Sequence, residues 1–368
     1  MTRGRALTMV LPGDLLTATG GYEYDRRMLD GLRQLGWSSS VVSLDPGFPT
    51  PTPRALEDAA ELISALPANS LVVIDGLALG AMPDVVHAHK DRLRMVGLVH
   101  HPLAAETGLA PELANRLFGS ERRALQAMCS VVVTSQRTRA ALADYDVAPD
   151  RISVIEPGTD QPVTESRDCD EQPSGTDAPV RMLCVATITA RKGHELLIEA
   201  LTELTDLNWT LTCVGSLERS PATVRALRAR IAAAGLEDRV VLMGEIDEAG
   251  LKSQFRAADL FVLATCYEGY GMAIAQALVH GLPIISTRTG AIEELVGPDA
   301  GALIEPGDRT ALRDALSRVL SDADLRRRFA DGARVAGAKV PDWGMACEKM
   351  AEVLTCVSCA RPDASGAM

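Results

Sequence analysis

The chain has 368 residues, of which 47% are hydrophobic and 23% are charged, and its formal net charge is −12. This length exceeds what one hydrophobic core fills, so two domains are expected. The acidic excess excludes nucleic acid as a partner, because binding a phosphate backbone needs a concentrated basic surface. No apolar run reaches about 18 residues and no signal peptide begins the chain, so a cytoplasmic protein is expected.

In the first part of the chain, short apolar segments alternate with helical patterns. Strands are expected at residues 7–11, 41–44, 71–74, 95–99, 131–134 and 152–155, and helices at 22–35, 53–66, 111–127 and 137–144. This alternation is typical of an α/β domain with a doubly wound, Rossmann-like parallel sheet. We expect the first domain to span residues 1–162.

Two polar features follow strands of this domain. The pair Gly20-Gly21 lies between the first strand and the first helix, where exposed backbone N–H groups could meet an anion or where the chain simply turns. His100 and His101 close the fourth strand, and Glu106 follows shortly after. An imidazole at a strand end can bind a hydroxyl. Glu106 could orient an acceptor, or it could be an ordinary surface or capping residue.

A polar segment at residues 163–179 lacks apolar periodicity and is expected to be a linker. The alternation then resumes and predicts a second Rossmann-like domain over residues 180–341. Strands are expected at 181–186, 210–214, 240–242, 260–263 and 284–286, and helices at 193–204, 221–234, 249–257, after 271, at 309–320 and at 324–336. Open α/β sheets bind ligands at the carboxyl ends of their strands, so we expect a site in a cleft between the two domains.

A cationic pair lies between a strand and a helix of the second domain. Arg191 and Lys192 precede Gly193 and the helical run that begins there. Two cations at a helix entrance would neutralise charge on a departing pyrophosphate, although a solvated pair at a loop tip fits the pattern equally well.

The segment Thr265 to Ala277, TCYEGYGMAIAQA, joins an apolar strand to a helix. The first N–H groups of a helix have no intrahelical partner and favour an anionic ligand. Gly269 and Gly271 allow close backbone approach, and Glu268 can accept hydrogen bonds from sugar hydroxyls. Phosphate and hydroxyl groups together suggest a nucleotide sugar.

This segment resembles the donor-site signature of glycosyltransferase family 4, retaining enzymes with the GT-B fold of two Rossmann-like domains facing across a cleft. In that family two glutamates eight positions apart flank a Gly-aromatic-Gly turn. Here the first is Glu268 and the aromatic residue is Tyr270, but Gln276 replaces the second glutamate. The resemblance covers about Gly20 to Val353 and is densest from Arg181 to Asp308.

The resemblance implies roles for the residues above. Glu268 would fix the donor sugar, Gln276 the ribose, and residues 269–272, including Tyr270 and Met272, the phosphates through backbone N–H groups. His100 would lie beside the reacting sugar, and Gly20-Gly21 would meet the distal phosphate or the acceptor. Lys192 matches a family lysine, and Arg191 would supply the charge of an arginine that the family often has where this chain has Thr187. A helix at 342–356 would return to the acceptor-side first domain, before a flexible tail at 357–368.

No metal or other cofactor is expected. The pairs Asp144/Asp146 and Asp168/Asp170 do not follow a strand at the expected site, and the Cys356/Cys359 pair lacks the second pair of ligands of a zinc site. We therefore expect a retaining, metal-independent glycosyltransferase with a nucleoside-diphosphate sugar as donor and a small molecule or glycan as acceptor. A non-catalytic nucleotide-sugar-binding protein, or a GT-B epimerase or phosphorylase, remains an alternative. Arginines at 116, 122, 123, 137 and 139 could form a membrane patch, but the acidic residues around them favour a soluble enzyme.

Overall fold

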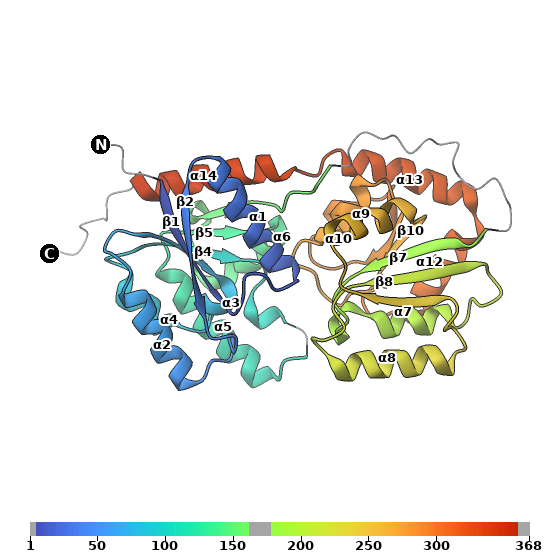
Figure 1. Cartoon of the computed structure of the whole chain (residues 1–368), viewed down its shortest axis with the longest axis horizontal. Coiled ribbons are helices and arrows are strands. Elements are labelled where there is room, and N and C mark those ends of the chain that lie inside the picture. The colour runs from blue at the N-terminus through green and yellow to red at the C-terminus, as the bar shows by residue number, and fades with distance from the viewer. Residues whose placement is uncertain (1–4, 107, 162–177, 360–368) are drawn as a thin grey trace. The chain divides into compact units, whose positions relative to one another are not determined.

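The computed structural model describes residues 5–106, 108–161 and 178–359 (Figure 1). The chain divides into two compact units, one of residues 1–158 with 341–368 and one of residues 159–340. We describe each unit by itself. Most of the segment expected as a linker, and the end of the expected tail, lie outside the described residues.

The first unit is built on a six-stranded parallel sheet in the order β2-β1-β3-β4-β5-β6. Its strands are β1 (Ala6–Pro12), β2 (Ser38–Leu44), β3 (Leu71–Asp75), β4 (Arg94–Val99), β5 (Ser130–Val133) and β6 (Ile152–Val154). The three central strands β3, β4 and β5 are apolar and almost wholly buried, as expected for a parallel sheet covered on both faces. Each buried Val, Leu or Ile side chain contributes about 1.5–3 kcal/mol relative to exposure.

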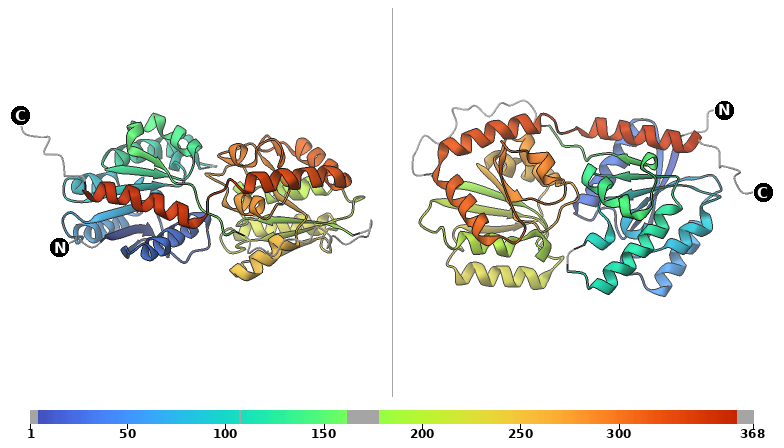
Figure 2. Two further views of the ribbon diagram at one scale, coloured as in Figure 1. Left: turned by 90° about the horizontal axis from the view of Figure 1, so that it is seen from above. Right: turned by 180° about the vertical axis from the view of Figure 1, so that it is seen from behind.

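Helices connect and cover these strands. They are α1 (Gly20–Gln34), α2 (Pro53–Ser64), α3 (Gly76–Leu79), α4 (Pro83–His89), α5 (Pro111–Gln126), α6 (Gln136–Ala141) and α14 (Trp343–Cys359). The last helix, α14, packs along α1, as the views in Figure 2 show. The rings of Tyr24 on α1 and Trp343 on α14 meet edge to face, with their centroids 6.1 Å apart. The end of the chain thus completes the first unit.

The second unit has a six-stranded parallel sheet in the order β12-β11-β10-β7-β8-β9. Its strands are β7 (Val180–Val185), β8 (Trp209–Val214), β9 (Val240–Gly244), β10 (Leu260–Leu263), β11 (Ile284–Thr287) and β12 (Gly301–Ile304). Its helices are α7 (His194–Leu201), α8 (Pro221–Ala233), α9 (Glu248–Ala257), α10 (Met272–Val279), α11 (Ile292–Val296), α12 (Arg309–Ser321) and α13 (Ala323–Gly337). The α/β class predicted from the sequence is confirmed in both units.

Several short elements differ from the expectation. Residues 301–304, which are not among the strands expected from the sequence, form the edge strand β12, which pairs with β11 in parallel register. The short helices α3, α4 and α11 were not predicted, since fewer than eight residues give no clear helical period. Helix α1 begins at Gly20 and not near Tyr22, because the Thr19 side chain accepts a hydrogen bond from the Tyr22 N–H and caps the helix before the glycine pair.

Candidate functional site

Each sheet has one point where the strand order reverses, and ligands of open α/β sheets bind outside the carboxyl ends of the strands at that point. In the first unit it lies between β1 and β3, and in the second between β7 and β10. The loops that follow these four strands carry Gly20-Gly21, Arg191, Lys192 and Glu268, whereas His100, His101 and Glu106 follow the next strand, β4. The fold therefore concentrates them at the carboxyl edge of each sheet.

In the second unit, the loop after β7 and the loop after β10 are joined by an ion pair. The Lys192 ammonium bonds the Glu268 carboxylate, and both side chains are largely buried. Arg191 Nη1 donates to the Tyr267 carbonyl at 2.6 Å, and the Cys266 N–H donates to the Arg191 carbonyl at 2.7 Å. These contacts hold the predicted leaving-group cations beside the predicted sugar-binding glutamate. The cations are thus not a solvated pair at a loop tip.

Gly193 allows this loop to pack against the end of β10. Its φ angle is +69°, and a Cβ built there would lie 1.8 Å from the Ala264 carbonyl oxygen. A non-glycine residue would face both backbone strain and a direct overlap. Gly193 therefore fixes where Lys192, the residue before it, is presented.

The turn from Glu268 into α10 has the expected form. Gly271 has a φ angle of +99° and no side chain caps the helix that begins at Met272. The Tyr270 side chain is buried in a small apolar cluster with Ala275, Ala291 and Val340. In the predicted donor-binding segment 269–272, the tyrosine ring is therefore occupied by packing. The backbone is the part of this segment that can contact a ligand at the start of α10.

Gln276 lies one turn into α10 and its amide already has partners within the second unit. Its Nε2 donates to the Asp160 carbonyl at 2.9 Å and lies 3.3 Å from Nε2 of His280. A glutamate could not make the first bond without being protonated, because a carboxylate only accepts. The glutamine that departs from the family pattern therefore fits its surroundings, while its predicted contact with the ribose stays a prediction.

In the first unit, three side chains from different elements converge. Nε2 of His100, which follows β4, lies 3.4 Å from Oδ1 of Asp25 on α1 and 3.6 Å from Oδ2 of Asp75 at the end of β3. We call this group the His100 cluster. The two carboxylate side chains are almost fully buried, whereas the imidazole is 21% exposed. Neither oxygen of Asp25 has a hydrogen-bond partner within standard geometry.

Burial and mutual repulsion alter the protonation of this cluster. Burial, and then the charge of Asp25, raises the pKa of Asp75 to about 7, against the opposing effect of His100. Burial alone would lower the pKa of His100, but the close approach and charge of Asp25, and then the charge of Asp75, outweigh it and raise that pKa. The cluster therefore retains protons that isolated side chains would release.

The glycine pair borders the same cluster. A Cβ built on Gly21 would lie 3.4 Å from Cδ2 of His100, so Gly21 leaves the ring just enough room. Gly20 and Gly21 lie in the first turn of α1, where N–H groups lack intrahelical acceptors. Their predicted contact with a phosphate or an acceptor is compatible with this position but stays a prediction.

His101 and Glu106 pair with each other. Their Nε2 and Oε2 atoms are 3.4 Å apart, and the Glu106 side chain is 40% exposed. Between them, the Leu103 N–H donates to the buried Glu121 carboxyl at 2.9 Å. Burial raises the pKa of Glu121 to about 8, partly opposed by the bonds from Leu103 and Tyr145. Glu121 thus holds the loop that carries the two predicted acceptor residues.

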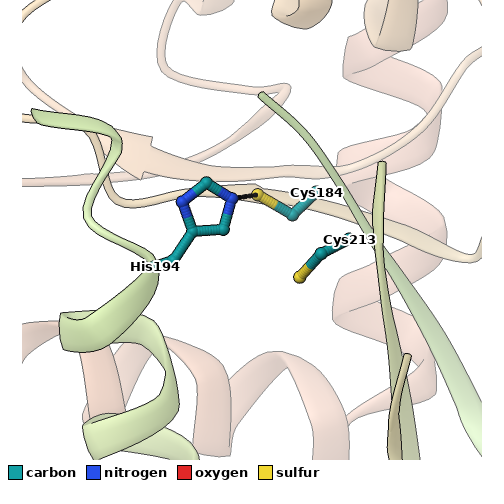
Figure 3. A group of neighbouring side chains, drawn as sticks. All are labelled: Cys184, His194 and Cys213. Carbon is teal, nitrogen blue, oxygen red and sulfur yellow. Dashed lines mark hydrogen bonds between the residues drawn. The ribbon is translucent and has the colours of Figure 1, made fainter. Parts of the chain in front are cut away.

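A second unpredicted cluster lies behind the loop of Lys192. Cys184 on β7 and Cys213 on β8 are paired in register, and Nε2 of His194, the first residue of α7, lies 3.6 Å from the Cys184 sulfur (Figure 3). Hydrogen bonding by Cys213 lowers the pKa of Cys184 to about 5, against burial, with help from His194. The donors could hold a thiophilic cation, but no fourth ligand joins them among the described residues, whereas structural zinc has four.

Solved structures similar to this chain share its fold. Sucrose-phosphate synthase from Thermosynechococcus elongatus superposes with a TM-score of 0.78 at 21% identity, covering 95% of this chain and 99% of that one. Anabaena HepE in complex with UDP-glucose superposes with a TM-score of 0.72 at 18% identity, covering 95% and 99%. The two units of this chain are therefore those of a GT-B protein.

The sequence comparisons identify the family. Residues 23–161 match the model described as Glycosyltransferase Family 4, and residues 179–322 match Glycosyl transferases group 1. D-inositol 3-phosphate glycosyltransferase of Xylanimonas cellulosilytica is 28% identical over 70% of this chain and 64% of its own length. MMP alpha-(1->4)-mannosyltransferase of Mycolicibacterium hassiacum is 27% identical over 81% of this chain and 73% of its own. The chain belongs to glycosyltransferase family 4. No described helix is both long and apolar enough to cross a membrane.

Sequence reasoning missed Asp25, Asp75 and Glu121. Asp75 ends the apolar strand β3, which is a detectable signal, and His100 directly follows the neighbouring strand, β4. Asp25 lies inside a helix that has the ordinary mix of charged residues, so nothing in the sequence distinguishes it from a solvated side chain. The two carboxylates that meet at His100 are not among the aspartate pairs considered from the sequence, and the expectation that no metal is needed stays a prediction.

Proposed function

We propose that this protein is a retaining glycosyltransferase that moves a sugar from a nucleoside diphosphate to an acceptor hydroxyl. The observation that carries the proposal is the Lys192–Glu268 pair, which joins the two loops at the switch point of the second sheet, just before α10. Cations, a helix N-terminus and a carboxylate in one place suit a pyrophosphate bonded to a sugar. The family assignment supports this reading.

The reaction proposed is a front-face substitution. The bond between the anomeric carbon and the β-phosphate oxygen breaks, and the acceptor oxygen bonds to the same face of that carbon. The departing phosphate takes the acceptor proton, so no separate base is needed. Lys192, Arg191 and the first N–H groups of α10 would stabilise the charge that develops on the phosphate. Glu268 would bind sugar hydroxyls while Lys192 fixes its orientation.

The donor and acceptor follow from similarity and charge. A solved neighbour is described in complex with UDP-glucose, so UDP-glucose is the first donor to test. The names of two relatives or neighbours, D-inositol 3-phosphate glycosyltransferase and sucrose-phosphate synthase, indicate small phosphorylated molecules, and we propose a small-molecule acceptor here. We propose no metal requirement, because Lys192 and Arg191 supply the positive charge that a metal would provide.

The proposal is tested by a thermal-shift screen of nucleotide sugars, followed by product analysis with candidate acceptors in the presence of a chelator. A ligand that binds only the folded state raises its stability with the logarithm of ligand excess. Sugar transfer with retained anomeric configuration would support the proposal. Donor binding without turnover would indicate a binding protein, and a changed sugar on the donor alone would indicate an epimerase. Loss of turnover in chelator, restored by magnesium or manganese, would contradict metal independence.

A further inference from the structure

We infer that Asp25 and Asp75 are positioning residues that hold His100 as an imidazolium, so that His100 donates a hydrogen bond to the substrate and does not act as a base. The inference deepens the proposed function and rests on it for the identity of the substrate. Its ligand class is an oxygen acceptor, either a sugar hydroxyl or an anionic phosphate oxygen. The argument comes from the charges, the geometry of the ring and the elements around it.

The charges of Asp25 and Asp75 favour a cation at this place. Asp25 and Asp75 are almost fully buried, and within the described part of the chain the only ion pairs of either are those with His100. A buried carboxylate without a counterion costs several kcal/mol, and two beside each other repel. A proton on His100 reduces both costs. The raised pKa of His100 agrees with this balance.

The geometry decides which nitrogen is left for a ligand. Both carboxylates lie nearest the same ring atom, Nε2, at 3.4 and 3.6 Å, so a proton on that atom faces two negative charges although no hydrogen bond of standard geometry forms. Tyr24 meets the ring edge to face at 5.3 Å, and Gly21 borders its Cδ2 edge. The ring is thus held from α1 and β3. The other ring nitrogen, Nδ1, is then the atom left to contact a ligand. In an imidazolium it carries a hydrogen and can only donate a hydrogen bond. A neutral ring bonded through Nε2–H would instead present a lone pair and could accept a proton.

The groups that face His100 come from each neighbouring element. Helix α1 supplies Asp25 and Tyr24, and the end of β3 supplies Asp75. From the other side, the hydroxyl groups of Thr134 and Thr138 bond the His100 carbonyl. Of these groups, only Asp25 and Asp75 bring carboxyl groups to the ring. They are therefore the side chains that set the charge of the ring.

The test is an NMR titration of the full chain labelled with ¹⁵N-histidine, in which the variant His100→Gln identifies the His100 signal. We expect His100 to titrate above the ordinary value of about 6.5, and Asp25→Asn or Asp75→Asn to lower its pKa by about one unit or more. Glu23→Gln, on the same helix but paired with Arg26 and Arg27, is the matched control and should leave it unchanged. Circular dichroism establishes that each variant folds. Because either aspartate can be replaced, the test still works if one of the two variants does not fold.

Turnover, measured against pH, tests the substrate part. If His100 donates as an imidazolium, kcat/KM falls as pH rises through the His100 pKa, and Asp25→Asn moves that fall to lower pH by the same shift. A base would lose activity on acidification, which would overturn the inference. An unchanged pKa of His100 in both aspartate variants would overturn it too. So would one equivalent of a divalent metal that copurifies with the wild-type protein and is lost in Asp25→Asn. The NMR titration does not depend on turnover. If only the proposed function failed, the change in the pKa of His100 in the aspartate variants would still be observed.

Discussion

The two units share one sheet architecture but carry candidate sites of opposite charge. Each has a six-stranded parallel sheet with one reversal of strand order, and each gathers polar side chains at or near the carboxyl ends of its strands. In the first unit, two carboxylates share one imidazole, whereas in the second, Lys192 and Arg191 accompany one glutamate. The fold sets where a site can form, and the loop residues set which charge it stabilises. We propose that the second unit stabilises a leaving phosphate, whereas the carboxyl and imidazole groups of the first unit have raised pKa values.

The largest effect is expected from the cation of the second unit. Lys192→Ala should lower kcat/KM by about 10²- to 10³-fold, or about 2–4 kcal/mol, because the charge on the departing phosphate loses its nearest ammonium. The measurement is steady-state kinetics with saturating acceptor. Lys252→Ala, which removes an exposed lysine paired with Glu248, is the control and should change nothing. Catalytic efficiency near that of the wild type in Lys192→Ala would refute the leaving-group role.

Glycines at the two sites should respond differently to the same substitution. Gly193→Ala should lower the free energy of unfolding by about 3 kcal/mol or more, because the new methyl group overlaps the Ala264 carbonyl at a positive φ. Gly21→Ala meets only a 3.4 Å contact with His100 and should change stability by about 1 kcal/mol or less. Urea denaturation of both variants measures this. Equal losses would mean that the loop of Lys192 is no more constrained than the start of α1.

Part of the pH dependence of stability should originate in the first unit. The folded pKa of Glu121 is raised to about 8 from an ordinary 4.5, so between these values the folded state holds a proton that the unfolded chain releases. Stability therefore falls as pH rises across this window. Glu121→Gln should remove a few kcal/mol of that fall, on the order of one to three, seen as a smaller difference between urea midpoints at pH 5 and pH 8. Asp75, whose pKa is also raised, should account for part of the remainder. An unchanged pH dependence in the variant would mean that Glu121 is ionised in the folded protein.

Gln276 gives the smallest expected effect. On the sequence pattern alone, Gln276→Glu would tighten nucleotide binding, since a carboxylate accepts from both ribose hydroxyls. In the structure it would instead face the Asp160 carbonyl, and we expect a loss of about 1–2 kcal/mol in stability and no gain in affinity. Gln276→Met is the control, because it removes the hydrogen bond to the Asp160 carbonyl without adding a charge. A larger loss of stability in Gln276→Glu than in Gln276→Met measures the repulsion between the new carboxylate and that carbonyl. Tighter binding of nucleoside diphosphate by Gln276→Glu would restore the sequence-based expectation.

The sequence predicts the sheets and the second unit's loops better than it predicts the His100 cluster. Strand-length apolar runs and glycines next to Lys192 and Glu268 are local signals, and the structure brings those two residues together. The His100 cluster depends on contacts between residues 25, 75 and 100, which only the topology of the sheet makes neighbours. Gln276 shows the same limit, because its partner Asp160 lies 116 positions away. Long-range polar pairing has no period and so leaves no pattern in the sequence.

The most direct test of the central claim is calorimetric titration of UDP and UDP-glucose into the wild-type protein and Lys192→Ala, in the presence of a chelator. If the second unit binds the diphosphate without a metal, the wild-type protein binds UDP and UDP-glucose in the presence of the chelator. The affinity of Lys192→Ala should then be lower by about tenfold or more, as expected for the loss of one charge-assisted contact. Glu23→Gln in the first unit should bind like the wild type. Binding that needs added magnesium, or equal affinities in wild type and Lys192→Ala, would contradict the account.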